Sequence, residues 1–174
     1  MSGRPNLFND CTGEAMVARH WTVMAEILLK LGGDEAVRPD SDPQIAKVLE
    51  RGSLQEGRQV RRLGQPHQCH ANSSELWLRS HGELLLCTGY ALTEQRSWLQ
   101  HSWCVAAGGP GEPVIFETTD PDWAKYFGIM LDEAESFAFA MANIKSRERL
   151  ADVFGDCPRM AERLGRILAV QGDR

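Results

Sequence analysis

The chemistry of this sequence centres on a cysteine, a histidine and a glutamate that follow one another in the middle of the chain. Cys69 opens a segment with helical spacing, His101 follows it by 32 residues, and Glu117 follows the histidine by 16. A thiol attacks an acyl carbon as a thiolate, and a helix N-terminus favours that anion through its dipole and free N–H groups. A histidine can take the proton, and a carboxylate can orient the imidazole and stabilise its charged form. This order of residues predicts a nucleophilic triad.

Four more residues lie near the triad in sequence or on the same face of an element. An oxyanion hole needs two donors, which the backbone N–H of the cysteine and a side-chain amide would supply. Gln65 and Gln68 are both available, and the sequence leaves open which of them points inward. Asn72 comes three residues after the cysteine on a similar helix face. Trp103 shares a strand face with His101, so we expect it to wall the site beside the imidazole.

The elements that position these residues are read from hydrophobic spacing and from glycine and proline. The segment GGPGEP is a strong turn signal between two strand-like segments, which predicts an antiparallel hairpin that places His101 beside Glu117. Residues 57–67 are interpreted as a basic segment without regular secondary structure that leads to the cysteine. The expected helices span 13–31, 43–51, 69–82, 131–154 and 158–170, and the expected strands span 82–92, 100–107 and 113–119.

Together these elements predict one α+β domain over residues 1–174. We expect a helix that carries cysteine at its N-terminus to pack on a small antiparallel sheet, with helices before and after it. The catalytic-type core covers about residues 57–130, and the helical flanks cover 13–50 and 131–170.

Composition narrows the classes of function. Of 174 residues, 43% are hydrophobic and 25% are charged, which is typical of a folded globular chain. The net charge of −5 and a single short basic group, Arg58, Arg61 and Arg62, argue against nucleic acid as a partner. No apolar run is long enough to span a membrane, and no secretory signal is visible. Five scattered cysteines without a CxxC pair indicate a reducing compartment, so we expect a cytoplasmic protein.

The strings QCHANS, GYAL, QHSW, VIFETT and YFGI carry a resemblance to a known superfamily. The order of cysteine on a helix, histidine on a strand and acid on the next strand resembles papain-like and transglutaminase-like cysteine enzymes. More closely, residues 65–130 look like a group of small bacterial and phage-encoded proteins of uncharacterised function. The resemblance implies a thiol hydrolase or acyl-transferase that needs no cofactor and acts on an amide of a protein or peptide. Deamidase, peptidase (thiol protease) and transglutaminase activities all remain open.

Two positions depart from the pattern of that group. Glu117 stands where aspartate is more common, which makes Asp120 an alternative third member of the triad. His70 stands where an aromatic residue is usual.

Two other functions compete with the hydrolase. One is a non-catalytic protein-binding or inhibitor protein of phage or bacterial origin on the same scaffold, favoured by helical ends that the motif does not need. The other is a zinc site formed by His67, Cys69, His70 and His101, although the paired spacing typical of zinc ligands is missing. Of the remaining cysteines, Cys87 and Cys104 are expected in the core, and Cys11 and Cys157 are expected to have no chemical role. The sequence leaves the oligomeric state open.

Overall fold

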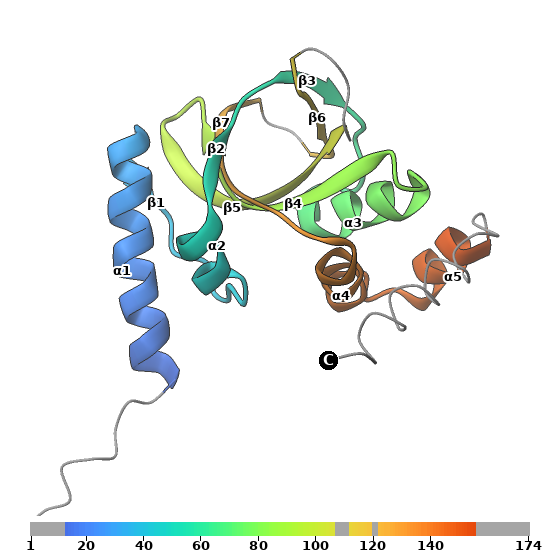
Figure 1. Ribbon diagram of the computed structural model, residues 1–174, viewed down its shortest axis with the longest axis horizontal. Coiled ribbons are helices and arrows are strands. Elements are labelled where there is room, and N and C mark those ends of the chain that lie inside the picture. The colour runs from blue at the N-terminus through green and yellow to red at the C-terminus, as the bar shows by residue number, and fades with distance from the viewer. Residues whose placement is uncertain (1–12, 107–111, 120–121, 156–174) are drawn as a thin grey trace, which may run out of the picture.

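The structure is a computed structural model that describes residues 13–106, 112–119 and 122–155. Within these ranges, helices precede and follow a curled, mixed β-sheet, so the chain has the α+β fold that the sequence predicts (Figure 1). The helices are α1 (Gly13–Leu31), α2 (Ile45–Arg51), α3 (Cys69–Arg79), α4 (Glu133–Asn143) and α5 (Arg147–Gly155). The strands are β1 (Glu35–Ala36), β2 (Ser53–Gln55), β3 (Arg58–Arg61), β4 (Leu84–Thr93), β5 (Ser97–Ala106), β6 (Val114–Glu117) and β7 (Trp123–Met130).

Helices α1 and α3 begin where the hydrophobic spacing predicts them. Helix α1 ends before Gly32, whose φ of 120° lies in the region that only glycine adopts without strain. Helix α3 begins at Cys69 and ends three residues before Gly82, which also has positive φ. The sequence therefore fixes the start of the helix that carries the nucleophile.

The single helix expected over 131–154 is in fact two helices. Helix α4 starts with a capping box in which Asp132 and Glu135 bond each other's backbone N–H groups. It stops at Ile144, which leaves helical geometry and is buried in the core. Ser146 then accepts a hydrogen bond from the backbone N–H of Arg149 and starts α5. The break puts residues 144–146 across from the N-terminus of α3.

The sheet is larger than expected and is not purely antiparallel. Its strand order is β2-β7-β4-β5-β6-β3, with β1 paired to β5 beside this path. The expected hairpin is confirmed in its pairing, since β5 and β6 run antiparallel with Cys104 opposite Phe116. The parallel pairs are β1 with β5 and β3 with β6.

Strand β7 was absent from the predicted elements, although it is central to the sheet. It pairs with both β2 and β4, and Gly128 lies so close to β4 that an added Cβ would meet the Thr88 carbonyl oxygen at 2.4 Å. The polar segment around Arg58–Arg61, expected to be irregular, forms β3 and pairs along β6. Strand pairing stabilises these segments where their own composition gives little signal.

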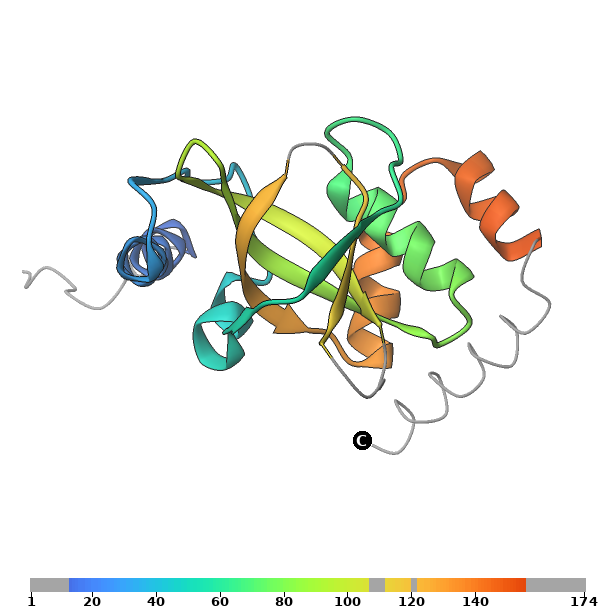
Figure 2. The same cartoon turned by 90° about the horizontal axis from the view of Figure 1, so that it is seen from above.

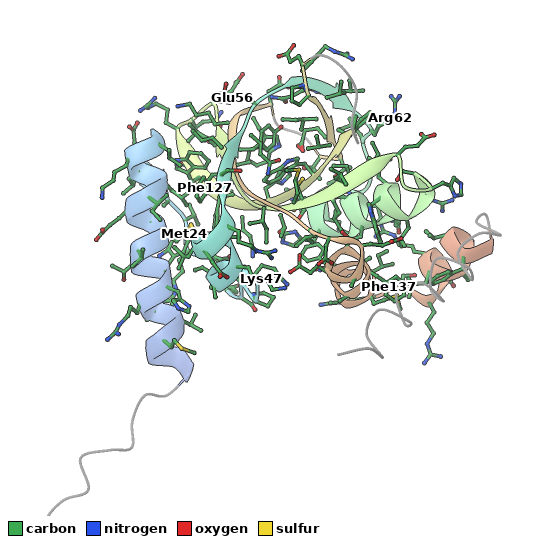
Figure 3. All side chains as sticks on the ribbon, in the orientation of Figure 1. Met24, Lys47, Glu56, Arg62, Phe127 and Phe137 are labelled. Carbon is green, nitrogen blue, oxygen red and sulfur yellow. The ribbon has the colours of Figure 1, made fainter. Side chains whose placement is uncertain are left out.

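The sheet has one face against the helices and one face enclosed by its own curl (Figures 1 and 2). The main core lies on the helical face, where Met24 of α1 and Phe127 of β7 are both buried (Figure 3). Alternate residues of the strands point to the other face, because side chains alternate along a strand. That second cluster consists of Cys87, Ala91, Trp103, Val105, Ile115, Trp123 and Tyr126.

Candidate active site

Cys69 is the first residue of α3, and its thiol is half-buried. The preceding Gln68 has φ −116° and ψ 41°, and its side chain does not cap the helix. The first helical hydrogen bond runs from Asn72 N to Gln68 O at 2.8 Å. The N–H groups of residues 69–71 precede this bond, so no carbonyl group within the helix accepts from them. The thiol thus lies beside donors that favour a negative charge.

His101 of β5 and Glu117 of β6 form a buried pair. The imidazole Nε2 lies 2.9 Å from both carboxylate oxygens, and the two residues are 1% and 2% exposed. Water therefore screens their attraction very little. Because Nε2 donates its hydrogen to the carboxylate, Nδ1 is the nitrogen available to exchange a proton with a thiol. The structure brings the predicted histidine and acid together, whereas Asp120 lies outside the described residues.

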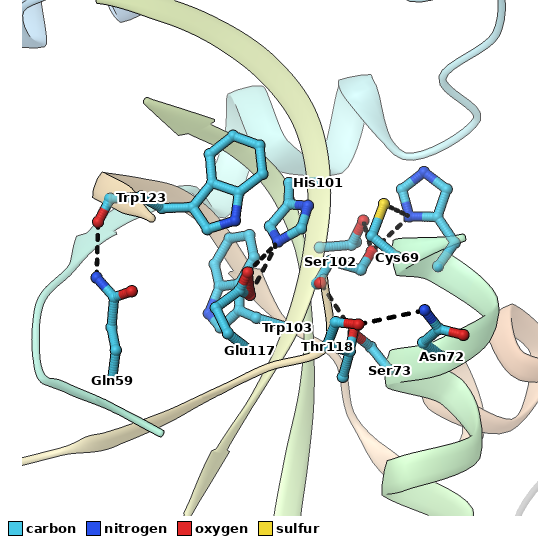
Figure 4. A network of polar contacts seen from close by, with 12 residues as sticks. Gln59, Cys69, Asn72, Ser73, His101, Ser102, Trp103, Glu117, Thr118 and Trp123 are labelled. Atoms are coloured by element: carbon cyan, nitrogen blue, oxygen red, sulfur yellow. Dashed lines mark hydrogen bonds and ion pairs between the residues drawn. The ribbon is translucent and has the colours of Figure 1, made fainter. Parts of the chain in front are cut away.

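Aromatic rings surround the imidazole on the side away from Cys69 (Figure 4). The ring of Trp123 lies 4.3 Å from that of His101, and Trp103 stacks at 6.2 Å with an interplanar angle of 15°. Trp103 lies beside the imidazole as predicted, but it is fully buried and donates to Gln55 Oε1 at 2.9 Å. Trp123 was not among the predicted site residues, because its strand, β7, was not among the predicted elements.

The pKa shifts of the Cys69 thiol and the His101 imidazole both favour the charged form of the group. Burial opposes ionisation of Cys69, but His101 and His70 outweigh it and lower the thiol pKa to about 5. Burial also opposes a charged His101, yet Cys69 and Glu117 raise the pKa of this imidazole to about 9. Burial raises the pKa of the Glu117 carboxyl. Between about pH 5 and pH 9 the site therefore holds a thiolate beside an imidazolium.

His70 is a second imidazole at the thiol, although the sequence predicted it only as a zinc ligand and as a departure from the pattern of the similar proteins. Its Nδ1 lies 3.9 Å from the sulfur of Cys69 and 2.7 Å from Ser102 Oγ. Its ring lies perpendicular to that of Phe139 of α4, with the ring centroids 5.5 Å apart. Its position directly after the cysteine was the signal that could have identified it.

Asn72 supports the loop before the nucleophile. Its amide nitrogen donates to Gln65 O at 2.7 Å and Thr118 O at 3.3 Å, and its oxygen accepts from Gln65 N at 3.2 Å. Gly64 leaves room for this side chain, because an added Cβ would lie 2.5 Å from Asn72 Cγ. These backbone bonds of the buried amide fix the loop before the nucleophile relative to Thr118, directly after β6.

The two glutamines take different roles in this loop. Gln68 Nε2 donates to Gln65 Oε1 at 2.7 Å, while Gln68 Oε1 accepts from Arg149 Nη1 at 2.5 Å. Arg149 also binds Asn72 Oδ1 at 3.1 Å and pairs with Glu75. Gln65 Nε2 has no acceptor among the residues that the structure describes, so it is the amide donor free to meet a ligand.

A cleft of about 590 Å³ opens over the thiol. One wall is the α3 start and its preceding loop, and the other is the junction between α4 and α5. The lining residues are Gln65, His67, Gln68, Cys69, His70, Ala71, Asn143, Lys145, Ser146, Glu148 and Arg149. The far wall was missed in the sequence because residues 131–154 were expected to form one uninterrupted helix.

The structure describes the predicted zinc ligands and two of the remaining cysteines. Cys87 and Cys104 are fully buried in the core, and burial raises the pKa of both thiols. Cys11 and Cys157 lie outside the described residues, as does the expected helix over 158–170. In the described part of the chain, no three histidine, cysteine or acidic side chains are grouped as a metal site.

No family model, no curated protein and no solved structure matches this chain. The resemblance of residues 65–130 to papain-like and transglutaminase-like enzymes therefore stays a prediction from the sequence. Across residues 13–106, 112–119 and 122–155, no helix has the length and apolar character needed to cross a bilayer.

Proposed function

We propose that the protein is a cysteine-dependent hydrolase or acyl-transferase that acts on an amide bond. Cys69 is the nucleophile, His101 carries the proton, and Glu117 orients the imidazole. One observation carries the proposal: a buried imidazole–carboxylate pair adjoins a half-buried thiol whose pKa is lowered to about 5. Burial raises the pKa of the core thiol Cys104, so the opposite shift at Cys69 favours a reactive nucleophile.

Acylation begins when the Cys69 thiolate attacks the carbonyl carbon of a bound amide. The C–S bond forms as the carbonyl π electrons move to oxygen, and the N–H of Cys69 and the amide of Gln65 donate to this oxyanion. The His101 imidazolium gives its Nδ1 proton to the amide nitrogen as the C–N bond breaks. The products are a neutral thioester and a free amine.

Deacylation moves the proton in the opposite direction. Neutral His101 takes a proton from water or from a primary amine, which attacks the thioester carbon while the C–S electrons return to sulfur. Water yields a carboxylic acid, and an amine yields a new amide. Glu117 accepts from Nε2–H throughout, so Nδ1 keeps the same orientation in both half-reactions.

The cleft supports a protein or peptide as the substrate. Most of the residues that line it are polar in type, with Lys145 and Glu148 on the far side and Gln65 on the near side. Polar walls on an open cleft suit an amide presented on a loop or an extended peptide better than an apolar small molecule. Three free thiols among the described residues, including Cys69, are consistent with a cytoplasmic protein in a reducing compartment.

The experiment that tests the proposal traps the acyl-enzyme. The purified protein is incubated with glutamine-containing and other peptides, and intact-mass spectrometry follows a thioester adduct on Cys69. Ammonia release, a new peptide N-terminus and incorporation of a primary amine then separate deamidase, peptidase and transglutaminase reactions. Cys69→Ala and His101→Phe should abolish the adduct, whereas His20→Gln, a matched change on α1, should leave it intact. Adducts on other residues, or none on Cys69 with any peptide class, would contradict the proposal.

The second candidate is a protein-binding role without turnover. Helix α1 supports it, because Met16, Val17 and Val23 are each at least 43% exposed and α1 contributes no residue to the cleft. In that case, replacing Val17 and Val23 by serine would abolish partner capture, and Cys69→Ala would leave it unchanged. A loss of biological activity on Cys69→Ala alone would instead support the enzyme.

A further inference from the structure

We propose that His70 is a second catalytic histidine, which stabilises the Cys69 thiolate by donating Nδ1–H to it and leaves proton transfer to His101. This inference deepens the proposed function and rests on it, because it assigns a role within the same thiol site. It starts from the position of the His70 ring, whose Nδ1 lies 3.9 Å from the sulfur and 2.7 Å from Ser102 Oγ.

The hydroxyl of Ser102 determines which hydrogen His70 carries. Ser102 Oγ donates its only hydrogen to Thr88 Oγ1 at 3.1 Å, so it accepts from His70. Nδ1 of His70 therefore bears a hydrogen, which it shares between Ser102 Oγ and the more distant sulfur, so this nitrogen cannot take the proton of the thiol. At His101 the opposite holds, since Nε2–H is bound by Glu117 and Nδ1 is the exchanging nitrogen. The two imidazoles thus differ in function: His70 keeps the hydrogen on its Nδ1, whereas His101 exchanges the proton on its Nδ1.

The elements that pack around His70 hold its ring in this orientation. From β5, the Gln100 side chain faces the imidazole and raises its pKa, while its amide nitrogen donates to Ser41 O at 3.3 Å. From α4 the neighbour is the uncharged Phe139. The charged groups that face His70 are therefore the Cys69 thiolate, which raises its pKa, and the His101 imidazolium, which opposes that rise.

A donor at the sulfur matters most when the thiolate is a leaving group. During deacylation His101 receives a proton from the attacking water or amine, while the C–S electron pair returns to sulfur. The N–H of His70 then meets the negative charge that forms on Cys69. Loss of this donor slows thioester breakdown, because the departing thiolate is less stabilised in the transition state.

The test measures the pKa of the Cys69 thiol from the pH dependence of its alkylation by iodoacetamide and of its thiolate absorbance. His70→Phe keeps a ring against Phe139 but removes the donor, and Ser102→Ala keeps His70 but removes the acceptor that fixes its hydrogen. We expect a midpoint near pH 5 for the wild-type protein. His70→Phe should raise it by roughly 1 pH unit or more, Ser102→Ala by less, and His20→Gln not at all. Acyl-enzyme should also accumulate in His70→Phe, which a purely structural role would not produce.

The outcomes separate this inference from the proposed function. A low wild-type midpoint that both His70→Phe and Ser102→Ala leave in place overturns the role of His70, while the triad stands. A wild-type midpoint near the ordinary cysteine value of about 8.5 overturns the proposed function itself. If His70→Phe fails to fold by circular dichroism, Ser102→Ala decides the question, because an unchanged midpoint in that variant contradicts a donor fixed by Ser102.

Discussion

Replacing Glu117 by glutamine should lower the upper pH limit of the thiolate–imidazolium pair, which is set by the pKa of His101. Glutamine has nearly the same shape but no charge, so it removes one of the two groups that raise the pKa of His101 to about 9. An opposite charge within hydrogen-bonding distance shifts a pKa by roughly 1 to 3 units. Without it we expect the His101 pKa near 7, about 2 units lower. The limb near pH 5, set by Cys69 with its two imidazoles, should move much less.

The size of the effect follows from the fraction of protonated His101. At pH 8 a pKa of about 9 leaves roughly 90% imidazolium, whereas a pKa near 7 leaves roughly 10%, which is a tenfold loss of the general acid. At pH 6 both proteins keep about 90% or more. The activity lost in Glu117→Gln should therefore grow steeply with pH.

Nuclear magnetic resonance of histidine-labelled protein measures this without a known substrate. The sequence has five histidines, and the His101 signal is assigned by its absence in His101→Phe. Glu94→Gln, an exposed change in the turn before β5, is the control and should leave the midpoint near 9. If His101 titrates at the same pH in Glu117→Gln as in the wild type, or if turnover falls equally at every pH, then Glu117 does not raise the pKa of His101.

Three further predictions concern the loop before the nucleophile. Gln65→Ala should lower kcat roughly 100-fold or more, because it removes a donor to the oxyanion. The pH profile of Cys69 alkylation should stay unchanged. Steady-state kinetics and alkylation rates measure the two effects, and an altered thiol pKa would contradict an oxyanion role. Arg149→Lys should lower kcat on the order of tenfold, because lysine cannot hold the three partners that the guanidinium binds; unchanged kinetics would exclude a positioning role. Gly64→Ala should destabilise the fold by about 1–3 kcal/mol in urea unfolding, since its Cβ would overlap Asn72; wild-type stability would contradict that close approach.

The sequence predicted the part of the site that depends on local signals. A glycine-rich turn implied the hairpin that brings His101 to Glu117, and helical spacing placed Cys69 at a helix start. Both features depend on residues close together in the chain, for which turn and helix preferences are informative.

The rest of the site depends on contacts between distant segments. Trp123 adjoins His101 only because β7 joins the middle of the sheet, a pairing that the mixed polar and apolar residues of this strand do not reveal. Arg149 reaches Gln68 across a break between α4 and α5 that a continuous helical pattern conceals. The sequence left open whether Asn72 bonds the site or supports the helix start, and its hydrogen bonds to the distant backbone of the loop are not visible in the spacing of residues.

The two walls of the cleft come from segments that lie far apart in the sequence, and the break between α4 and α5 forms one of them. Residues 65–71 carry the nucleophile and its donors, while residues 143–149 supply the opposite wall. Within the described chain, no hydrogen bond joins residues 143–149 to His101, to Glu117 or to the sulfur of Cys69. Exchanging the exposed Lys145 and Glu148 would alter which molecules fit without disturbing the reactive groups, provided that Arg149 is kept. The fold therefore makes specificity and reactivity independently variable, with a single guanidinium as the link between them.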